Sequence, residues 1–156
     1  MAIVGFSFTK ILAEKRGPIK GRVSIKNNVS ILGVEDAGFS MAKEKKGLRI
    51  KFAFDSTYEP EIGVIRFEGE VLLLEEAKVA ASILERWAKE KALPAQMVAP
   101  ILNQVLDRSN IQALVTAREL NLPSPIQLPR VTLKKGVTGK EEKKKGAKEG
   151  KKEGKK

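Results

Sequence analysis

Histidine and cysteine are both absent from the 156 residues of this chain. Without cysteine the chain cannot form disulfides, thiolate zinc sites or thiol nucleophiles. Without histidine it lacks the most common general base. A glycine-rich phosphate loop, of either the P-loop or the dinucleotide type, is also missing. We therefore expect a protein that is not an enzyme and that uses no cofactor.

Carboxylates in pairs can do acid–base work, and they are frequent in the middle of the chain. They occupy polar strand positions or turns, where a charged side chain is ordinarily a solvated surface group. No spaced motif for a carboxylate metal site is present among them. We interpret the following residues as plain surface charge: Asp36, Asp55, Glu59, Glu61, Glu68, Glu70, Glu75 and Glu76.

Long apolar runs are absent as well, since none approaches the length of a membrane span. The apolar start, Met1 to Phe8, is short and has no basic region before it, unlike a signal peptide. We expect a cytoplasmic protein that does not insert into membranes.

The clearest local pattern is a β-hairpin between Gly47 and Leu74. Apolar and polar residues alternate on both sides of a polar turn at Asp55 to Pro60, which indicates two strands with one apolar face. Aromatic residues on a sheet can stack RNA bases, but Phe52 and Phe54 share the apolar face, where core packing is the better account. Tyr58, beside the turn, is expected to be exposed.

An isolated hairpin is marginal in water, so it needs further strands and a cover. Ile3–Ala13 and Gly21–Val34 have strand character, and Glu35–Lys46 is mixed enough to predict a loop. Asn27 falls on the apolar register of the second strand, which indicates an irregularity or a buried amide that needs partners. The first half of the chain thus predicts four antiparallel strands.

The second half changes to a helical period. A helix is predicted from Glu75 to Lys91, and a second from Pro94 to Leu120, in which Pro100 predicts a kink or a later start. Asp107–Asn110 could interrupt this second helix. Three prolines within 121–130 then favour an extended segment, which either lies across the domain or is a ligand for a proline-recognising groove.

Most of the positive charge lies at the end of the chain. From Lys134 to Lys156 there are 11 lysines and 4 glutamates, a net +7 of the total +11. We expect residues 1–133 to form one α+β domain and residues 134–156 to be a disordered basic tail. The tail either only solubilises the protein or gives loose, salt-sensitive contacts to RNA or the ribosome. The candidate nucleic-acid contacts are Lys143, Lys144, Lys145, Lys151 and Lys152.

The end of the hairpin departs from its one-sided pattern. From Val71 to Leu74 the strand is apolar on both faces, so Leu72 and Leu74 lie on a face that is otherwise polar. We predict these two leucines as contacts for a second subunit or for a client polypeptide.

The order of elements resembles the export chaperone SecB and SecB-like proteins. The local resemblance is the helix around Ile101-Leu102-Asn103-Gln104-Val105-Leu106 and the exit Leu120-Asn121-Leu122-Pro123-Ser124-Pro125-Ile126. The chain looks more like an archaeal member than a bacterial one. The resemblance covers residues 3–131, mostly through architecture.

The resemblance implies a four-stranded antiparallel sheet followed by two helices packed on one face. It also implies a cytosolic homo-oligomer that joins through strand edges or sheet faces and holds unfolded polypeptides in apolar grooves. One departure is clear: bacterial SecB is acidic and hands clients to an ATPase through acidic surface, whereas this chain is basic. A handover to a translocase is therefore in doubt.

Overall fold

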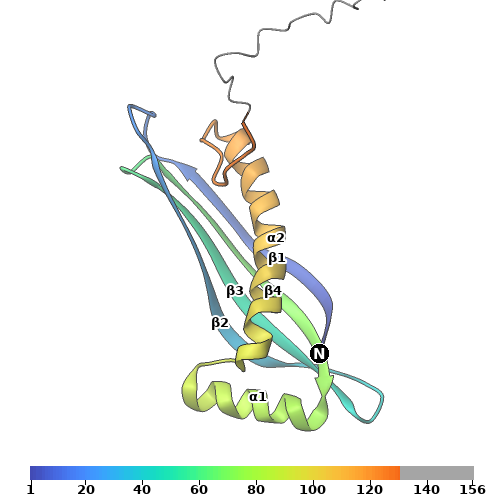
Figure 1. Cartoon of the computed structure of the whole chain (residues 1–156). Coiled ribbons are helices and arrows are strands. Elements are labelled where there is room, and N and C mark those ends of the chain that lie inside the picture. The colour runs from blue at the N-terminus through green and yellow to red at the C-terminus, as the bar shows by residue number, and fades with distance from the viewer. Residues whose placement is uncertain (131–156) are drawn as a thin grey trace, which may run out of the picture.

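The computed structural model describes residues 1–130, which form four strands and then two helices (Figure 1). The predictions for the tail, including its five candidate lysines, lie outside the described residues. The elements in chain order are β1 (Ala2–Lys15), β2 (Ser24–Met41), β3 (Lys45–Glu59), β4 (Gly63–Glu76), α1 (Ala77–Glu90) and α2 (Ala95–Glu119).

The strands form one antiparallel sheet in the order β1-β4-β3-β2. The β3–β4 hairpin lies in the middle, with Leu48 opposite Leu73 and Phe54 opposite Phe67. β1 and β2 lie at the two edges. The alternation of the sequence gives the two central strands one apolar face that must be covered. The predicted fold class is confirmed.

Two strand boundaries were predicted wrongly. The expected turn at Asp55–Pro60 is mostly strand, because β3 continues to Glu59 and keeps pairing with β4 as far as Tyr58. The expected loop at Glu35–Lys46 is largely strand as well. β2 continues to Met41, with an irregularity between Asp36 and Ser40 in which Gly38 has a φ of 76°. A bulge of this kind lets a strand continue through residues that break its alternation.

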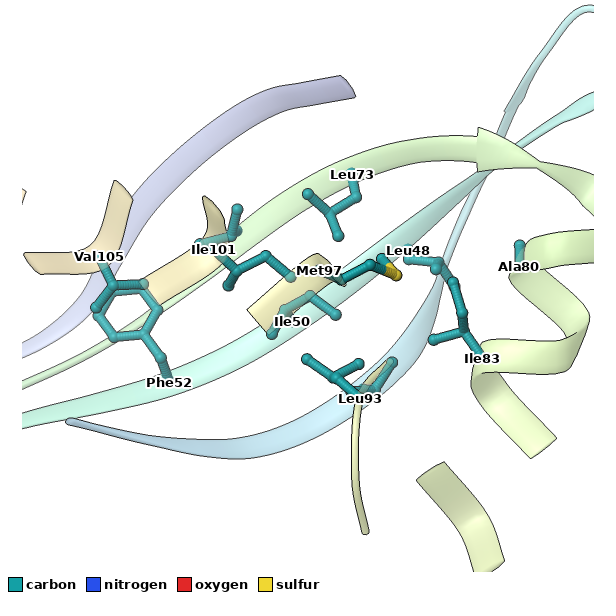
Figure 2. Packing of buried hydrophobic residues seen from close by; sticks show 12 residues of the cluster. Leu48, Ile50, Phe52, Leu73, Ala80, Ile83, Leu93, Met97, Ile101 and Val105 are labelled. Atoms are coloured by element: carbon teal, nitrogen blue, oxygen red, sulfur yellow. The ribbon is translucent and has the colours of Figure 1, made fainter. Parts of the chain in front are cut away.

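Both helices cover the same face of the sheet, with α2 along the strands and α1 at one end (Figure 1). The core beneath α1 and the start of α2 is aliphatic: Figure 2 shows Ile83, Leu93 and Met97 directed toward Leu48 and Ile50. All five are less than a tenth exposed. Burial of this apolar face, at about 25 cal/mol per Å², is the main force that holds the two layers together.

α2 is one continuous helix, so the interruption expected at Asp107–Asn110 is wrong. It begins at Ala95, directly after Pro94, and so does not start later on account of Pro100, which lies inside it. Its buried positions recur every fourth residue: Met97, Ile101, Val105, Ser109, Ala113 and Ala117. The last three side chains are small, and Ala113 and Ala117 pack in a second core that contains Phe54, Phe67 and Tyr58.

Candidate functional site: the segment that follows α2 and the hollows beside it

After α2 the chain turns back onto the sheet and runs without helix or strand from Asn121 to Arg130, a stretch that we call the exit segment. Asn121 takes a left-handed conformation (φ 51°), and the backbone N–H of Leu122 donates to the carbonyl of Ala117 at 2.8 Å. Leu122 and Pro125 are buried. The exit segment therefore lies across the domain, as one of the two sequence-based alternatives proposed.

Two side chains of the sheet hold the exit segment by its backbone. The Tyr58 hydroxyl donates to the carbonyl oxygen of Pro123 at 2.8 Å, and the Asn27 side-chain amide donates to that of Pro125, also at 2.8 Å. The bonded carbonyls belong to alternate residues. Neither bond depends on the side chain of the residue that accepts it, so these two donors bind the main chain of a segment that bends at Pro125 and Ile126.

The donors are set in place by the register of β2 and β3. Asn27 lies opposite Ser56, and Tyr58 lies two residues further along β3 on the same, helix-covered face. The Ser56 hydroxyl donates to the side-chain oxygen of Asn27 at 2.7 Å, which leaves the amide nitrogen of Asn27 free to point at the exit segment. Asn27 is exposed, not buried as one of the sequence-based alternatives had it, yet both ends of its side-chain amide have partners.

Tyr58 is fully buried, so the expectation that it is exposed was wrong. Burial raises the pKa of its hydroxyl to about 12. At neutral pH the group is therefore protonated and acts as a hydrogen-bond donor. The polar sequence around Tyr58 suggested a turn, but the strand continues through it, and the ring becomes part of the second core.

Open space borders the exit segment on both sides. Toward the sheet edge there is a hollow of about 1070 Å³, lined by Val23, Ile25 and Asn27 of the β2 side and by residues 123–130. We call it the β2 hollow. Toward the helix there is a smaller depression of about 410 Å³, lined by Leu114, Val115, Ala117 and Arg118 with parts of the exit segment. We call it the α2 hollow. The exit segment thus lies between the β2 hollow and the α2 hollow and lines both of them.

Leu72 and Leu74 lie on the other face of the sheet and are half-buried. Leu72 rests over Gly5 of β1, and Leu74 is paired with Gly47, whose place for a side chain is taken by the Phe39 ring. These residues form a small apolar patch at the end of the sheet where α1 lies.

Ion pairs occupy much of that outer face, and ion pairs account for most of the acidic residues named above. Arg66 contacts Asp55 at 2.7 Å and Glu68 at 3.0 Å, and Arg49 contacts Glu70 at 3.1 Å. At the end of β2, a hydrogen bond from Lys46 is the largest cause that lowers the pKa of Asp36. Within residues 1–130 no group of three acidic side chains lies close enough to hold a metal ion.

The order and packing of the strands and helices define the class of fold. Four antiparallel strands followed by two helices on one face make a SecB-like fold. No family model and no curated protein sequence matches the chain. Among solved structures, it is similar to the SecB-like chaperone Rv1957 of Mycobacterium tuberculosis, in complex with a ChAD peptide from the Rv1956 HigA1 antitoxin.

That similarity extends over most of both proteins, with 84% of this chain and 89% of the other covered. The TM-score is 0.52 and the sequence identity is 12%, so the likeness concerns the fold alone. In the described part of the chain, no helix combines the length and apolar character needed to cross a membrane.

Sequence reasoning found part of this site. Asn27 was singled out because an amide on an apolar register needs partners, and the exit segment was expected to dock. Tyr58 was missed as a donor, since nothing in the sequence places it opposite Ile25 and beneath Pro123. Its being the only tyrosine of the chain was the one available signal.

Proposed function

We propose that this protein is a non-catalytic holdase that binds unfolded polypeptide segments. The observation that carries the proposal is the exit segment itself: a stretch of chain without helix or strand already lies on the helix-covered side of the sheet, held through two backbone carbonyls. The hollows beside it offer apolar lining and polar groups together. The solved structure with a similar fold is a chaperone bound to a peptide, which supports the same kind of ligand.

Such a protein needs no reacting group, and we propose that it acts only by binding. It would prevent aggregation by covering the apolar segments of a client until the client folds or is passed on. We further propose a cytoplasmic, homo-oligomeric protein, with the Leu72 and Leu74 patch available for subunit or client contact. The archaeal character of the chain stays a prediction.

Suppression of aggregation tests the proposal. A denatured client is diluted into buffer with the full chain, and light scattering is followed over time. We expect scattering to fall as the protein approaches a stoichiometric amount, while an equal amount of an unrelated basic protein of similar size has little effect. Unchanged scattering at stoichiometric protein would contradict the holdase proposal.

A second candidate function is loose association with RNA or the ribosome, which the 11 lysines between residues 134 and 156 favour. Each lysine near a phosphate releases a counterion, so the binding would be independent of sequence and would weaken steeply with salt. RNA binding is compared between the full chain and a chain that ends at Leu133. Binding that survives this deletion, or that is absent even at low salt, counts against this function.

Mass in solution, measured before and after nuclease treatment, separates the two candidates. A dimer or tetramer that is insensitive to nuclease supports the holdase. A monomer that co-purifies with RNA supports the alternative.

A further inference from the structure

We propose that the exit segment is a built-in competitor for the client: it occupies the backbone-binding donors of Tyr58 and Asn27 and must leave before an unfolded polypeptide can use them. This inference rests on the proposed holdase function and adds a regulatory step to it. The closed state is the one in this structure, with residues 123 and 125 bonded to the sheet. In the open state the same donors meet the carbonyls of an extended client.

The donors suit many clients because they bind carbonyl oxygens of the main chain, which every extended polypeptide presents at alternate residues. A client also meets the apolar lining of the β2 hollow, to which Val23 and Ile25 contribute. The exit segment therefore differs from a client in its covalent attachment and not in the kind of contact that it makes.

The attachment of the exit segment to the domain becomes weaker along its length. Leu122 is anchored in the second core, and Pro123 and Pro125 accept the two hydrogen bonds. Among the described residues beyond Pro125, none donates or accepts a hydrogen bond to the sheet or to α2. Gln127 to Arg130 are exposed. The segment can thus leave from its far end while Leu122 keeps its place.

Proline favours the closed state. A proline has few conformations when free, so docking a segment that contains Pro123 and Pro125 costs little conformational entropy. Because only the open fraction can bind, the apparent affinity for a client equals the intrinsic affinity multiplied by that fraction. Raising the entropy of the free segment should therefore strengthen client binding without any change in the sheet.

The test uses the full chain with Pro123→Gly and Pro125→Gly together, which keeps both acceptor carbonyls. The matched control is Pro18→Gly, which changes an exposed proline that lies outside the exit segment and lines neither hollow. The probe is a reduced, carboxymethylated and fluorescently labelled protein that cannot fold, and its binding is followed by anisotropy. We expect the double variant to bind up to about tenfold more tightly than the unchanged chain, and the control to match the unchanged chain.

A second variant covers the case in which the glycine variant does not fold. Val23→Cys and Gln127→Cys place two thiols on opposite sides of the β2 hollow in a chain that has no other cysteine. A flexible bis-maleimide that contains a cleavable disulfide then ties the exit segment down. We expect the tie to weaken client binding by at least about tenfold relative to the untied double-cysteine chain, and a reductant to restore it.

Tighter binding by the glycine variant supports the competitor. Weaker binding by the tied chain that recovers on reduction supports it as well when the same reagent attached to Val23→Cys alone leaves client binding unchanged, which shows that the linker does not itself block the β2 hollow. Client binding that is the same in all variants and in the tied chain overturns the competitor but leaves the holdase intact. Failure of every form, including the glycine variant, to bind the unfolded probe overturns both.

Discussion

Ser56 and Ser109 are the buried polar side chains of residues 1–130, and they lie in opposite environments. The Ser56 hydroxyl donates to Asn27 and so helps to orient the amide that holds the exit segment. The Ser109 hydroxyl lies on the sheet side of α2 and has no hydrogen-bond partner. A buried hydroxyl without a partner destabilises the folded state, whereas a bonded one stabilises it.

Replacing each serine by alanine should therefore shift stability in opposite directions. We expect Ser56→Ala to lower the free energy of unfolding by about 1 kcal/mol, because Asn27 loses a donor. We expect Ser109→Ala to leave it unchanged or raise it, since alanine also suits a helix. Denaturant titration measures the free energy of unfolding of both variants, and each variant is the control for the other. Equal losses from both would show that the two hydroxyls do not differ as described.

Tyr58 gives the stability of the protein a dependence on alkaline pH. Its folded pKa is about 12, raised from 10.0 by burial, so its contribution to stability is complete below pH 10 and is lost as the pH rises toward 12. We expect the free energy of unfolding to fall more steeply over this range in the unchanged chain than in Tyr58→Phe. All other side chains are the same in the two proteins, so their effect cancels in the difference. Parallel curves would contradict the assignment.

For single residues, the sequence predicts which positions face the core but not which hydrogen bonds their side chains form. Asn27 stood out because its chemistry conflicts with its register. The partner of that amide, the carbonyl of Pro125, lies 98 residues away in the chain, and no local pattern reports such a distance.

In β4, the packing around Gly69 requires a residue without a side chain. A Cβ added at Gly69 would overlap the backbone carbonyl of Ser7 and lie 2.6 Å from the Phe52 ring. The stacked and edge-on phenylalanines at this point, including Phe6, Phe8 and Phe52, thus depend on the absence of a side chain in β4.

Gly69→Ala should therefore destabilise the fold by about 1–3 kcal/mol through overpacking. Gly33→Ala is the matched control, because a Cβ there meets nothing nearer than 3.8 Å and the residue also lies within a strand. Thermal unfolding of both variants measures the difference. A Gly69→Ala chain as stable as its control would show that Phe52 and β1 can move aside at little cost.

Elements were predicted well where their periodicity was strong and less well at their ends. The helices and the hairpin followed from spacing alone. The continuation of β2 through Gly38 did not, because a bulge shifts the alternation that identifies a strand. α2 continues past Asp107–Asn110 since its buried face keeps its four-residue spacing, and tertiary packing of that face outweighs local preference.

For the whole molecule, the outer face of the sheet is largely covered with ion pairs, and the Leu72 and Leu74 patch interrupts them. A protein that assembles or binds clients through this patch should lose that ability when the patch becomes polar. In the double variant Leu72→Ser and Leu74→Ser we expect a smaller mass in solution, or weaker client binding, with little change in secondary structure.

Val64→Ser is the control for this variant, because Val64 is a half-buried residue of the same strand and face at the opposite end of β4. Light scattering gives the mass, and the anisotropy assay gives client binding. If both variants behave like the unchanged chain in both measurements, the patch is not a contact surface.

The class of fold followed from the order of strands and helices, but the arrangement of the strands did not. The alternation of apolar and polar residues shows which face of a strand is buried, but it does not show which strand lies next to it. The exit segment was expected to be extended and docked, yet its bonds to Tyr58 and Asn27 depend on where α2 ends above the sheet. The place where α2 ends is determined only when the helices pack on the sheet.

The place of β1 in the sheet has a consequence for how the chain reaches its folded state. β2, β3 and β4 are neighbours both in sequence and in space, so they can pair through short turns. β1 pairs only with β4, and its partners lie between 48 and 72 residues further along the chain. Closing so long a loop is slow, so we expect β1 to join after the transition state, with substitutions in it mainly affecting the unfolding rate.

During synthesis β1 leaves the ribosome before β4, the strand with which it pairs. At roughly 5–20 residues per second, the delay is on the order of 2–14 s. Throughout that interval an apolar strand with Phe6 and Phe8 has no sheet to join. During this interval one of the protein's own strands is therefore an exposed apolar segment of the kind that the protein is proposed to bind.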